Sequence, residues 1–358
     1  MTKLSDLFDL ALFEEMKGKG FVRVQRHPEF PNELAIANYT NRTQINYLWN
    51  EVTTQCRGLI YHPETLEIIA RPFKKFFNHD ESKADKFMPD DEVEVFDKLD
   101  GSLGISYERP DGMWAIATRG SFTSDQAIWA TQYLSNRIQD YPFGAGYTDL
   151  FEIIYPENRI VVSYDFQGLV YLGTINVNTG EFGFEGEFFY PTADRMYRGK
   201  LRDFEFLERE NREGVVLVAK DGRRAKMKYD EYVRLHRVVS RLSARSVWEL
   251  MQGPDGDIES LVSQLPEEHA TWAREVAQAL RGQYFTMHMY ITELAMKHDV
   301  KKRERKEVAL ALEGEPAWAR AAIFRGLDNK SYTDVLWKNL RPREDVEGGV
   351  DEGEKESS

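Results

Sequence analysis

The stretch "EVEVFDKLDGSLGISYE", residues 92–108, contains two β-strand patterns separated by an Asp-Gly pair. The alternation of apolar and charged residues predicts a half-buried strand that ends near Lys98, and "LGISYE" predicts a second strand. Because glycine lets a ligand approach the backbone closely, Lys98 is expected at a fixed position beside a close-fitting turn. A single match of this kind is most often a turn with a surface lysine, so a functional role for Lys98 requires further matching residues elsewhere in the chain.

Similar strand patterns recur up to about residue 230, and turn pairs such as Asp111-Gly112 and Asp221-Gly222 join several of them. The further runs are "CRGLIYH", "EIIARPF", "MWAIATR", "DLFEIIY", "RIVVSYD", "LVYLGTINV", "GVVLVAK" and "RRAKMKY". A helix is predicted near 125–139, behind Ser124 as its N-cap. Beyond residue 230 the periodicity is helical.

The sequence therefore predicts an α+β fold with two domains. Residues 1–238 are expected to form antiparallel sheets with flanking helices, and residues 239–343 a small all-α domain. Residues 344–358 hold seven acidic residues and one lysine among glycines and serines, which predicts a disordered tail.

Composition bounds the class of protein. With 358 residues, 42% of them hydrophobic, the chain can build ordinary buried cores. No run approaches 18 apolar residues and the first 20 residues lack a signal-peptide pattern, so a soluble, intracellular protein without a membrane partner is expected. The single cysteine, Cys56, cannot form an internal disulfide, and with no histidine nearby in sequence a free, inert thiol is favoured over a catalytic one.

The net charge of −13 argues at first against a nucleic-acid partner. The acidic tail accounts for −6 of it, however, and residues 220–245 carry nine Lys or Arg against three acidic residues. A basic stripe thus exists within an acidic protein, although a solvated helix face explains residues 234–245 equally well.

Four more charged residues fit a common site with Lys98. Glu152 lies in "DLFEIIY", where its neighbours should face the opposite side of the strand, and Glu213 precedes an apolar strand. Lys226 and Lys228 are two residues apart and should share one strand face. Each alone could be an ion-pair partner or a solvated residue, but their joint occurrence favours a site.

Lysines and carboxylates of this kind suit covalent nucleotidyl transfer. Two cations near Lys98 would disfavour its protonated form and would hold a triphosphate, while carboxylates supply the oxygen ligands that Mg²⁺ prefers. Lys98 would attack the α-phosphorus of a nucleoside triphosphate and keep the nucleotide as a phosphoramidate. Asp100 and Gly101 would shape the turn and contact the ribose.

The ordered set "KLDG", "FEII", "EGVV" and "KMK" resembles the motifs of the covalent nucleotidyltransferase superfamily, which contains ATP-dependent DNA ligases, RNA ligases and mRNA capping enzymes. The flanking segments "CRGLIYH", "RPFKKFFNHDE", "TRGSFTSDQA" and "KMKYDEYVRLH" are similar to those of the family of the bacteriophage T4 single-strand RNA ligase, an end-joining enzyme of tRNA repair. The resemblance spans roughly residues 38–236.

The resemblance implies a role for each matching residue. It makes residues 1–238 a nucleotidyltransferase (adenylyltransferase) domain with Lys98 as the adenylated nucleophile. Glu152 and Glu213 match acidic residues that organise the metal, and Lys226 and Lys228 match lysines on the α-phosphate and the pyrophosphate path. The remaining matches are Arg57 and Lys75, which contact the triphosphate or an RNA 5′-phosphate, Tyr232 in the nucleotide pocket, and Arg119, which stands where the family has a lysine.

The implied reaction has three steps: ATP and Lys98 give lysyl-AMP, AMP passes to an RNA 5′-phosphate to give AppRNA, and an RNA 3′-hydroxyl displaces AMP. The cofactors implied are ATP and Mg²⁺, with Mn²⁺ as a substitute. The expected partners are single-stranded RNA ends, cleaved tRNA among them, and a monomer in the cytoplasm is expected, the host cytoplasm if a phage encodes the chain.

Three alternatives remain at this level. A DNA ligase or a GTP-using capping enzyme would share the central residues, but those families usually continue into a β-rich oligonucleotide-binding fold, whereas this chain turns helical. A non-catalytic RNA-binding relative would be expected to lose the nucleophile or the carboxylates.

The basic residues of the helical part have two interpretations. Arg234, Arg237, Arg241 and the run at 301–306 could guide RNA, or they could pair with nearby glutamates. His236 is more consistent with packing or hydrogen bonding than with catalysis.

Overall fold

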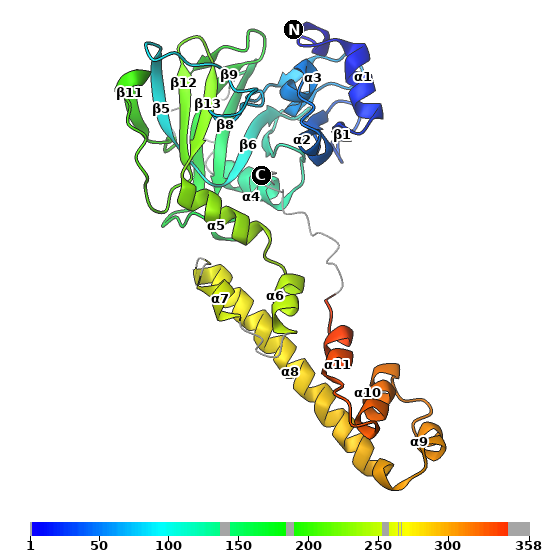
Figure 1. Ribbon diagram of the computed structural model, residues 1–358. Coiled ribbons are helices and arrows are strands. Elements are labelled where there is room, and N and C mark those ends of the chain that lie inside the picture. Colours follow the sequence, from blue (N-terminus) through cyan, green and yellow to red (C-terminus); the bar gives the residue numbers. More distant parts are fainter. Residues whose placement is uncertain are drawn as a thin grey trace. The chain divides into compact units, whose positions relative to one another are not determined.

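The computed structural model describes residues 2–136, 144–183, 190–252, 258–263, 265 and 267–342 (Figure 1). The chain divides into two compact units, with the division between Arg234 and Leu235. The predicted boundary at 238–239 falls inside helix α5 (Asp230–Ser240). The predicted acidic tail, 344–358, lies outside the described residues.

The first unit is built on three sheets in which every pairing between strands is antiparallel (Figure 1). The first sheet has the order β1 (Val22–Arg26), β2 (Ala35–Tyr39), β3 (Arg57–Tyr61), β4 (Ile68–Ala70). The second has the order β10 (Phe182–Gly183), β9 (Gly168–Asn176), β8 (Tyr147–Ile154), β6 (Ser102–Glu108), β7 (Trp114–Ala117). The third has the order β11 (Arg195–Lys200), β5 (Glu92–Lys98), β12 (Gly214–Ala219), β13 (Arg224–Lys228).

The third sheet has one apolar face, as the alternation in 92–98 predicts. Val93 and Val95 of β5 pack with Val215 and Leu217 of β12 in one buried cluster. Because side chains alternate along a strand, Lys98 and its same-face neighbours point to the other side of the sheet. This difference between the faces fixes the register of the strands and therefore the position of each lysine.

Short helices flank the sheets of the first unit. They are η1 (Leu4–Asp6), α1 (Leu10–Gly18), α2 (Asn41–Ile45), α3 (Glu51–Gln55), α4 (Asp125–Ser135), η3 (Pro156–Asn158) and η4 (Leu201–Asp203). Helix α4 begins where the sequence predicts, and the Ser124 side chain accepts a hydrogen bond from the backbone N–H of Ala127. Of the predicted span 125–139, residues 137–139 lie outside the described part of the chain.

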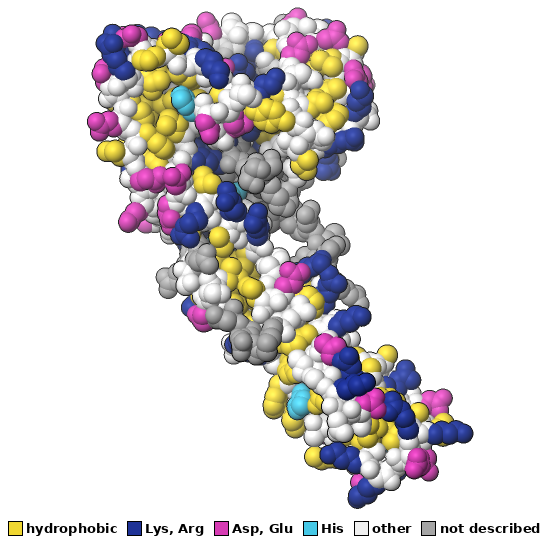
Figure 2. Space-filling view, in the orientation of Figure 1, with side chains coloured by type: hydrophobic (Ala, Val, Ile, Leu, Met, Phe, Trp, Pro, Cys, Tyr) yellow, Lys and Arg dark blue, Asp and Glu magenta, His cyan; other side chains and the backbone are white. Residues whose placement is uncertain are grey.

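In the second unit, the described residues form helices and the turns between them, and no strand (Figure 1). This confirms the predicted change from strands to helices after about residue 230. Its helices are α6 (Ala244–Met251), α7 (Glu259–Val262), α8 (Glu267–Lys297), η5 (Val300–Lys302), α9 (Arg305–Ala311), α10 (Ala317–Leu327) and α11 (Thr333–Asn339). One core lies where α6 packs on α8, and the indole N–H of Trp248 donates to the carbonyl of Trp337 at 2.8 Å. Lys and Arg side chains are spread over the surface of this unit with acidic side chains between them (Figure 2).

Within the described residues, no helix combines the length and the apolar character needed to cross a membrane. Cys56 is buried, and burial raises the pKa of its thiol, as expected for an inert cysteine.

One strand prediction is wrong. The run "RIVVSYD", residues 159–165, is not a strand, because the backbone N–H groups of Val161 and Val162 donate to the side chain of Asp100 instead of to a neighbouring strand. Strands β1, β2, β10 and β11 are not among the predicted runs. Two of these, β10 and β11, are sheet edges with short or largely exposed sequences, which carry little periodicity.

Candidate active site

Three strands of the third sheet bring Lys98 and Lys228 to the same end of that sheet. Gly214, the first residue of β12, lies opposite Lys98 of β5 on one side and opposite Lys228 of β13 on the other. Lys226 is two residues before Lys228, so it shares that face, and Met227 packs against the apolar cluster on the opposite face. The prediction that Lys226 and Lys228 lie on one face of the strand is therefore confirmed.

A glycine is required between the two lysine strands. Gly214 has a φ of +153°, and a Cβ at this position would lie 2.0 Å from the carbonyl oxygen of Met227 and 2.7 Å from the Cα of Lys228. No side chain fits in that space. The glycine of "EGVV" thus permits the close approach of β12 and β13 that sets the separation of the lysines.

Glu213 joins the two lysines directly. Its Oε1 atom lies 2.7 Å from Nζ of Lys98 and 3.4 Å from Nζ of Lys228. The side chains of Glu213 and Lys228 are 4% and 7% exposed, while that of Lys98 is 22% exposed. A single buried oxygen therefore holds the two ammonium groups, and Lys98 alone keeps substantial access to solvent.

This contact modifies the predicted electrostatics. The sequence predicts that Lys226 and Lys228 favour the neutral amine of Lys98, but the carboxylate in direct contact with Lys98 favours its ammonium form. A proton must leave Nζ before Lys98 can act as a nucleophile, and Glu213 is in hydrogen-bonding distance to accept it.

Glu152 lies beside the Asp-Gly turn. It is on β8 opposite Leu103 of β6, and its neighbours Phe151 and Ile153 are fully buried. A Cβ on Gly101 would lie 2.5 Å from the carbonyl oxygen of Ile153 and 3.3 Å from Oε1 of Glu152. Because residue 101 is glycine, the turn after Lys98 can lie directly against β8 and its carboxylate.

The two glutamates occupy a site that disfavours their charge. The pKa of Glu152 is raised to about 8. Burial is the largest cause, the Glu213 and Asp100 carboxylates contribute to the rise, and Lys98 and Arg57 oppose it. Burial also raises the pKa of Glu213, with Lys98 and Lys228 opposing it. A bound cation would relieve this cost.

A divalent metal fits this donor set only in part. Glu152 and Glu213 offer the oxygen ligands that Mg²⁺ prefers. In the part of the chain that the structure describes, there is no group of three or more His, Cys, Asp or Glu side chains that could hold a metal ion by itself. The two carboxylates therefore suit an ion that takes its other ligands from water and from phosphate oxygens, as Mg²⁺ usually does.

Asp100 is bound within the protein. Its Oδ1 atom accepts a hydrogen bond from the hydroxyl of Tyr232 at 2.7 Å, and its Oδ2 atom accepts from the backbone N–H groups of Val161 and Val162, both at 2.8 Å. Its own N–H donates to the hydroxyl of Tyr164 at 2.8 Å. Asp100 is 3% exposed. It fixes the turn, as predicted, whereas contact between its carboxylate and a ribose stays a prediction.

Tyr232 therefore has a defined structural position. It is 4% exposed, and its ring lies 5.5 Å from Nζ of Lys228 in addition to its hydrogen bond to Asp100. Tyr232 lies on α5, four residues after Lys228. It ties the end of β13 to the turn that follows Lys98, and its place in a nucleotide pocket stays a prediction.

Lys75 and Arg119 share an aromatic support. Nζ of Lys75 lies 5.8 Å, 5.5 Å and 5.6 Å from the ring centres of Tyr39, Trp49 and Phe77. Arg119 donates from Nη1 to the hydroxyl of Tyr39 at 2.8 Å. Lys75 is 8% exposed, so aromatic faces replace much of its hydration. The sequence analysis missed Tyr39 and Trp49, because no motif distinguishes them from ordinary core aromatics.

The segment that carries Lys75 runs beside β13. The N–H of Lys226 donates to the carbonyl of Phe77 at 3.1 Å, and the N–H of His79 donates to the carbonyl of Lys226 at 2.8 Å. Arg57, the first residue of β3, has its guanidinium 5.8 Å from the ring centre of Phe76, and its buried Nε lacks a hydrogen-bond partner. Backbone pairing thus places "RPFKKFFN" against "KMK", as a phosphate-binding role for both requires.

Comparison with known proteins shows that this chain is similar to RNA ligases. The model of the RNA ligase family matches residues 55–189, which include Lys98 and Glu152. A putative bifunctional polynucleotide kinase/RNA ligase of Autographa californica nuclear polyhedrosis virus is 26% identical over 262 residues, 62% of this chain and 35% of the relative. RNA ligase 1 of bacteriophage TS2126 is 26% identical over 185 residues, 43% of this chain and 46% of the relative.

This chain spans less than half the length of those two relatives. Among solved structures, an archaeal ATP-dependent RNA ligase is similar with a TM-score of 0.43 and 14% identity, covering 75% of this chain and 74% of that one. The family match rests on the segment that carries the lysine turn and the first glutamate strand. Residues 55–189 of this chain are thus similar to the RNA ligase family, and the resemblance drawn from the motifs is confirmed.

Proposed function

We propose that this protein is an ATP-dependent RNA ligase that joins an RNA 3′-hydroxyl to an RNA 5′-phosphate through lysyl-AMP and AppRNA. The observation that carries the proposal is the Glu213 oxygen shared by Lys98 and Lys228. It holds a partly accessible amine and a buried cation together at the end of one sheet, as nucleophilic attack on a phosphate requires.

In the first step, the Lys98 amine forms a bond to the α-phosphorus of ATP and the bond to the pyrophosphate oxygen breaks. Glu213, 2.7 Å from Nζ, takes the proton that Lys98 must lose, and burial prepares it by raising the pKa of its carboxyl. When Glu213 is protonated, its ion pair with Lys228 is lost, so Lys228 can interact more strongly with the phosphate charge that builds up. Lys226, on the same strand face, adds a second cation.

Glu152, together with Glu213 as long as Glu213 is ionised, would hold Mg²⁺, for which Mn²⁺ could substitute. A bound divalent cation would neutralise phosphate charge and so make attack by the amine easier. Arg57, Lys75 and Arg119 are proposed to contact the triphosphate or the RNA 5′-phosphate. Tyr39 would keep two of these cations, Lys75 and Arg119, in position through ring and hydroxyl contacts.

The two later steps use the same cations. An RNA 5′-phosphate oxygen attacks the phosphorus of lysyl-AMP, and the bond to Nζ of Lys98 breaks to give AppRNA. The 3′-hydroxyl of a second end then attacks the RNA 5′-phosphorus, and AMP leaves. Because each step places charge on a phosphate beside Lys226 and Lys228, one site can serve all three.

The finer assignments are also proposals. We expect single-stranded RNA ends as substrates, with cleaved tRNA as a candidate, and a monomer that works in the cytoplasm, where ATP and RNA occur together. Residues 1–238 are proposed as the adenylyltransferase domain and residues 239–343 as an accessory helical domain.

The first test is to incubate the protein with Mg²⁺ and ATP labelled at the α-phosphate and to measure the label that survives denaturing electrophoresis. Wild type should be labelled and Lys98→Ala should not. Lys302→Ala, which removes a lysine whose side chain is 80% exposed, is the matched control and should be labelled like wild type. Labelled protein should then circularise a 5′-phosphorylated single-stranded RNA.

Other outcomes point elsewhere. Label from GTP in place of ATP would indicate a capping-type reaction. Absence of label from folded, AMP-free protein would contradict the covalent mechanism and favour a non-catalytic RNA-binding protein.

A further inference from the structure

A polar pocket of about 750 Å³ lies in the first unit, at the end of β13 that begins with Arg224. The segment 71–74, the turn between β9 and β10 and the turn between β12 and β13 line it. Four of the lining residues are basic, Arg71, Lys74, Lys220 and Arg224, and two are acidic, Glu181 and Asp221. An excess of positive charge is notable in a chain of net charge −13.

Three of these cations form no side-chain ion pair within the described residues, although the Asp85 carboxylate accepts a hydrogen bond from the backbone N–H of Arg224 at 2.9 Å. Lys220 pairs with Glu92, but among the described residues no ion pair involves Arg71, Lys74 or Arg224. The guanidinium of Arg71 lies over Gly180, where a Cβ would be 2.7 Å from its Cζ atom. Burial lowers the pKa of Arg71. A half-buried guanidinium of this kind is available for an anion.

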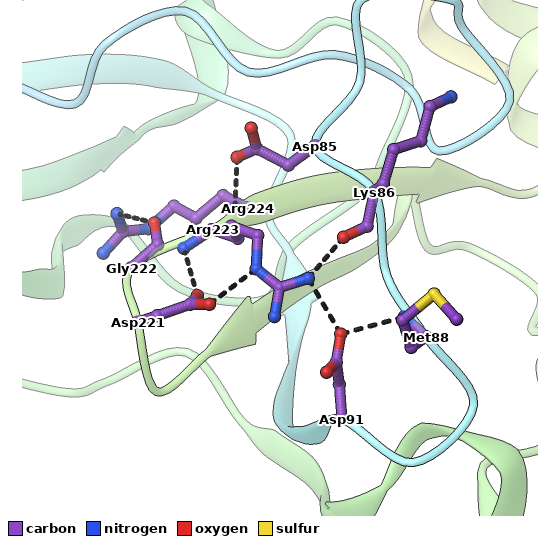
Figure 3. Close-up of polar contacts among 8 residues, drawn as sticks. All are labelled: Asp85, Lys86, Met88, Asp91, Asp221, Gly222, Arg223 and Arg224. Atoms are coloured by element: carbon purple, nitrogen blue, oxygen red, sulfur yellow. Dashed lines mark hydrogen bonds and ion pairs between the residues drawn. The ribbon is translucent and has the colours of Figure 1, made fainter.

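Arg223 and Arg224 behave differently although they are adjacent (Figure 3). The guanidinium of Arg223 is held by Asp91, by Asp221 and by the carbonyl of Lys86. That of Arg224 extends away from these groups and makes one long hydrogen bond, 3.3 Å, to the carbonyl of Gly222 (Figure 3). Its Nη2 atom is buried without a hydrogen-bond partner.

Aromatic side chains hold Arg224 at the pocket. Its Cζ atom lies 4.6 Å from the ring centre of Phe73 and 4.4 Å from that of Phe182. Burial lowers the pKa of Arg224 to about 10, so the side chain remains a cation at neutral pH. Tyr147, 37% exposed, also lines the pocket and offers a ring on which a base could stack.

The pocket continues the candidate active site along one strand face. Arg224, Lys226 and Lys228 alternate on β13, so they point to the same side of the sheet. Four residues of strand, about 13 Å, separate Arg224 from Lys228. A chain of phosphates that leaves the reacting centre along β13 would therefore meet Lys226 and then Arg224.

We propose that this pocket binds a backbone phosphate of the single-stranded RNA substrate, through Arg71 and Arg224, at a nucleotide away from the reacting end. The backbone phosphates of a single-stranded RNA are spaced along its chain, as the cations are spaced along β13. Single-stranded nucleic acid is commonly bound by such a row of basic residues with aromatic rings beside it. The inference rests on the proposed RNA ligase function.

The test measures binding of a 5′-hydroxyl single-stranded RNA, fluorescently labelled at its 3′ end, by anisotropy over a range of salt concentrations. Arg224→Gln and Arg71→Gln should each weaken binding roughly tenfold at low salt, the loss expected for a charge-assisted hydrogen bond. Each should also reduce the slope of log Kd against log salt by about 0.7, the value for one phosphate contact on a single strand.

Arg109→Gln is the matched control, because Arg109 is ion-paired with Glu29 and Asp111 and does not line the pocket. It should change neither the affinity nor the slope. Lysyl-AMP formation from ATP, measured on the same preparations, reports folding and the ATP site. Arg71→Gln leaves the Arg224 contacts intact, so it keeps the test decisive if Arg224→Gln does not fold.

Unchanged RNA binding by both variants, with normal lysyl-AMP formation, would overturn the inference and leave the proposed function standing. Loss of lysyl-AMP with unchanged RNA binding would assign the pocket to a phosphate of ATP and would equally overturn it. Failure of the wild type to form lysyl-AMP would count against the proposed function itself, whatever the pocket binds.

Discussion

The two units of this protein differ in the burial of their ion pairs. In the sheets of the first unit, Lys98 and Lys228 share a Glu213 carboxylate that is 4% exposed. In the helical unit, the Arg305–Asp328 pair has side chains that are 61% and 37% exposed, which is typical of its other ion pairs. Chemistry that depends on fixed charges is thus expected in the sheets.

The physical reason is the dependence of ion pairs on burial. An exposed pair contributes about 0.2–1 kcal/mol and is screened by salt. Loss of one partner from a buried pair leaves an uncompensated charge and costs about 3–5 kcal/mol. Under the proposed function, the exposed charges of the helical unit suit a general attraction for RNA, whereas the buried charges of the sheet unit suit the positioning of a lysine amine against a phosphorus atom.

The largest effect is expected for Glu213→Gln. This change removes the carboxylate that pairs with both Lys98 and Lys228 and that is proposed to accept the proton of Lys98, so lysyl-AMP formation should fall by about 100-fold or more. The rate of label transfer from ATP in a single turnover measures it.

Asp328→Asn is the matched change in the helical unit, because it also converts a carboxylate that pairs with a basic residue, Arg305, into an amide. It should alter the rate less than twofold and the free energy of unfolding by less than about 0.5 kcal/mol. Similar losses of activity from both variants would mean that burial does not separate the two units in the way described.

Glycines provide a second contrast, in stability. Gly214→Ala would place a methyl group 2.0 Å from the carbonyl oxygen of Met227, so β12 and β13 must separate, and a loss of more than about 3 kcal/mol is expected. Gly282, inside α8, has no atom within 4 Å of its Cβ position. Gly282→Ala should therefore stabilise the helix by about 0.5–1 kcal/mol.

Urea unfolding of both variants, followed by circular dichroism, measures these changes. If Gly214→Ala unfolds at the same urea concentration as wild type, the close approach of the two strands is not needed. In that case the separation of Lys98 and Lys228 would have to be set by other contacts.

Sequence reasoning succeeds for residues whose role depends on strand alternation. The positions of Lys98, Glu152, Lys226 and Lys228 on strands and faces follow from patterns of period two, because the opposite face of each strand is apolar. The α+β class and the change to helices after residue 230 follow from periodicity in the same way.

Prediction from the sequence fails where a side chain, and not a neighbouring strand, accepts the backbone hydrogen bonds. Val161 and Val162 donate hydrogen bonds to Asp100, so a run that resembles a strand is instead a loop that fixes the turn after Lys98. Likewise, Tyr39 supports Lys75 and Arg119 from β2, a strand that the sequence patterns did not reveal. Contacts between residues far apart in sequence leave no local periodic signal.

A third prediction concerns pH. The pKa of Glu152 is about 8 in the folded protein and 4.5 ordinarily, so between these values the folded state binds more protons than the unfolded state. Wild type should therefore lose stability relative to Glu152→Gln as pH rises from about 4.5 to about 8, with the full loss above 8. The variant should melt several degrees higher than wild type at pH 9, since 1 kcal/mol corresponds to about 2–4 °C.

Thermal unfolding at pH 5, 7 and 9, with EDTA and without ATP, measures this difference. A constant difference in melting temperature across the range would show that Glu152 does not titrate there. Added Mg²⁺ should reduce the difference at pH 9, since a cation bound at the two carboxylates would stabilise the wild type.

The smallest effect is expected for Lys301→Ala combined with Lys302→Ala in the helical unit. Lys302 makes one exposed ion pair, 3.4 Å, with Asp299, and both lysines are on the surface. Lysyl-AMP formation should change less than twofold, and affinity for single-stranded RNA should fall a fewfold at low salt only, because exposed charges act through a screened field. Anisotropy titrations at low and at physiological salt measure the second effect. A tenfold loss at physiological salt would instead mean that these lysines bind specific phosphates, and the helical unit would then take part in selecting the RNA as directly as the sheets take part in joining it.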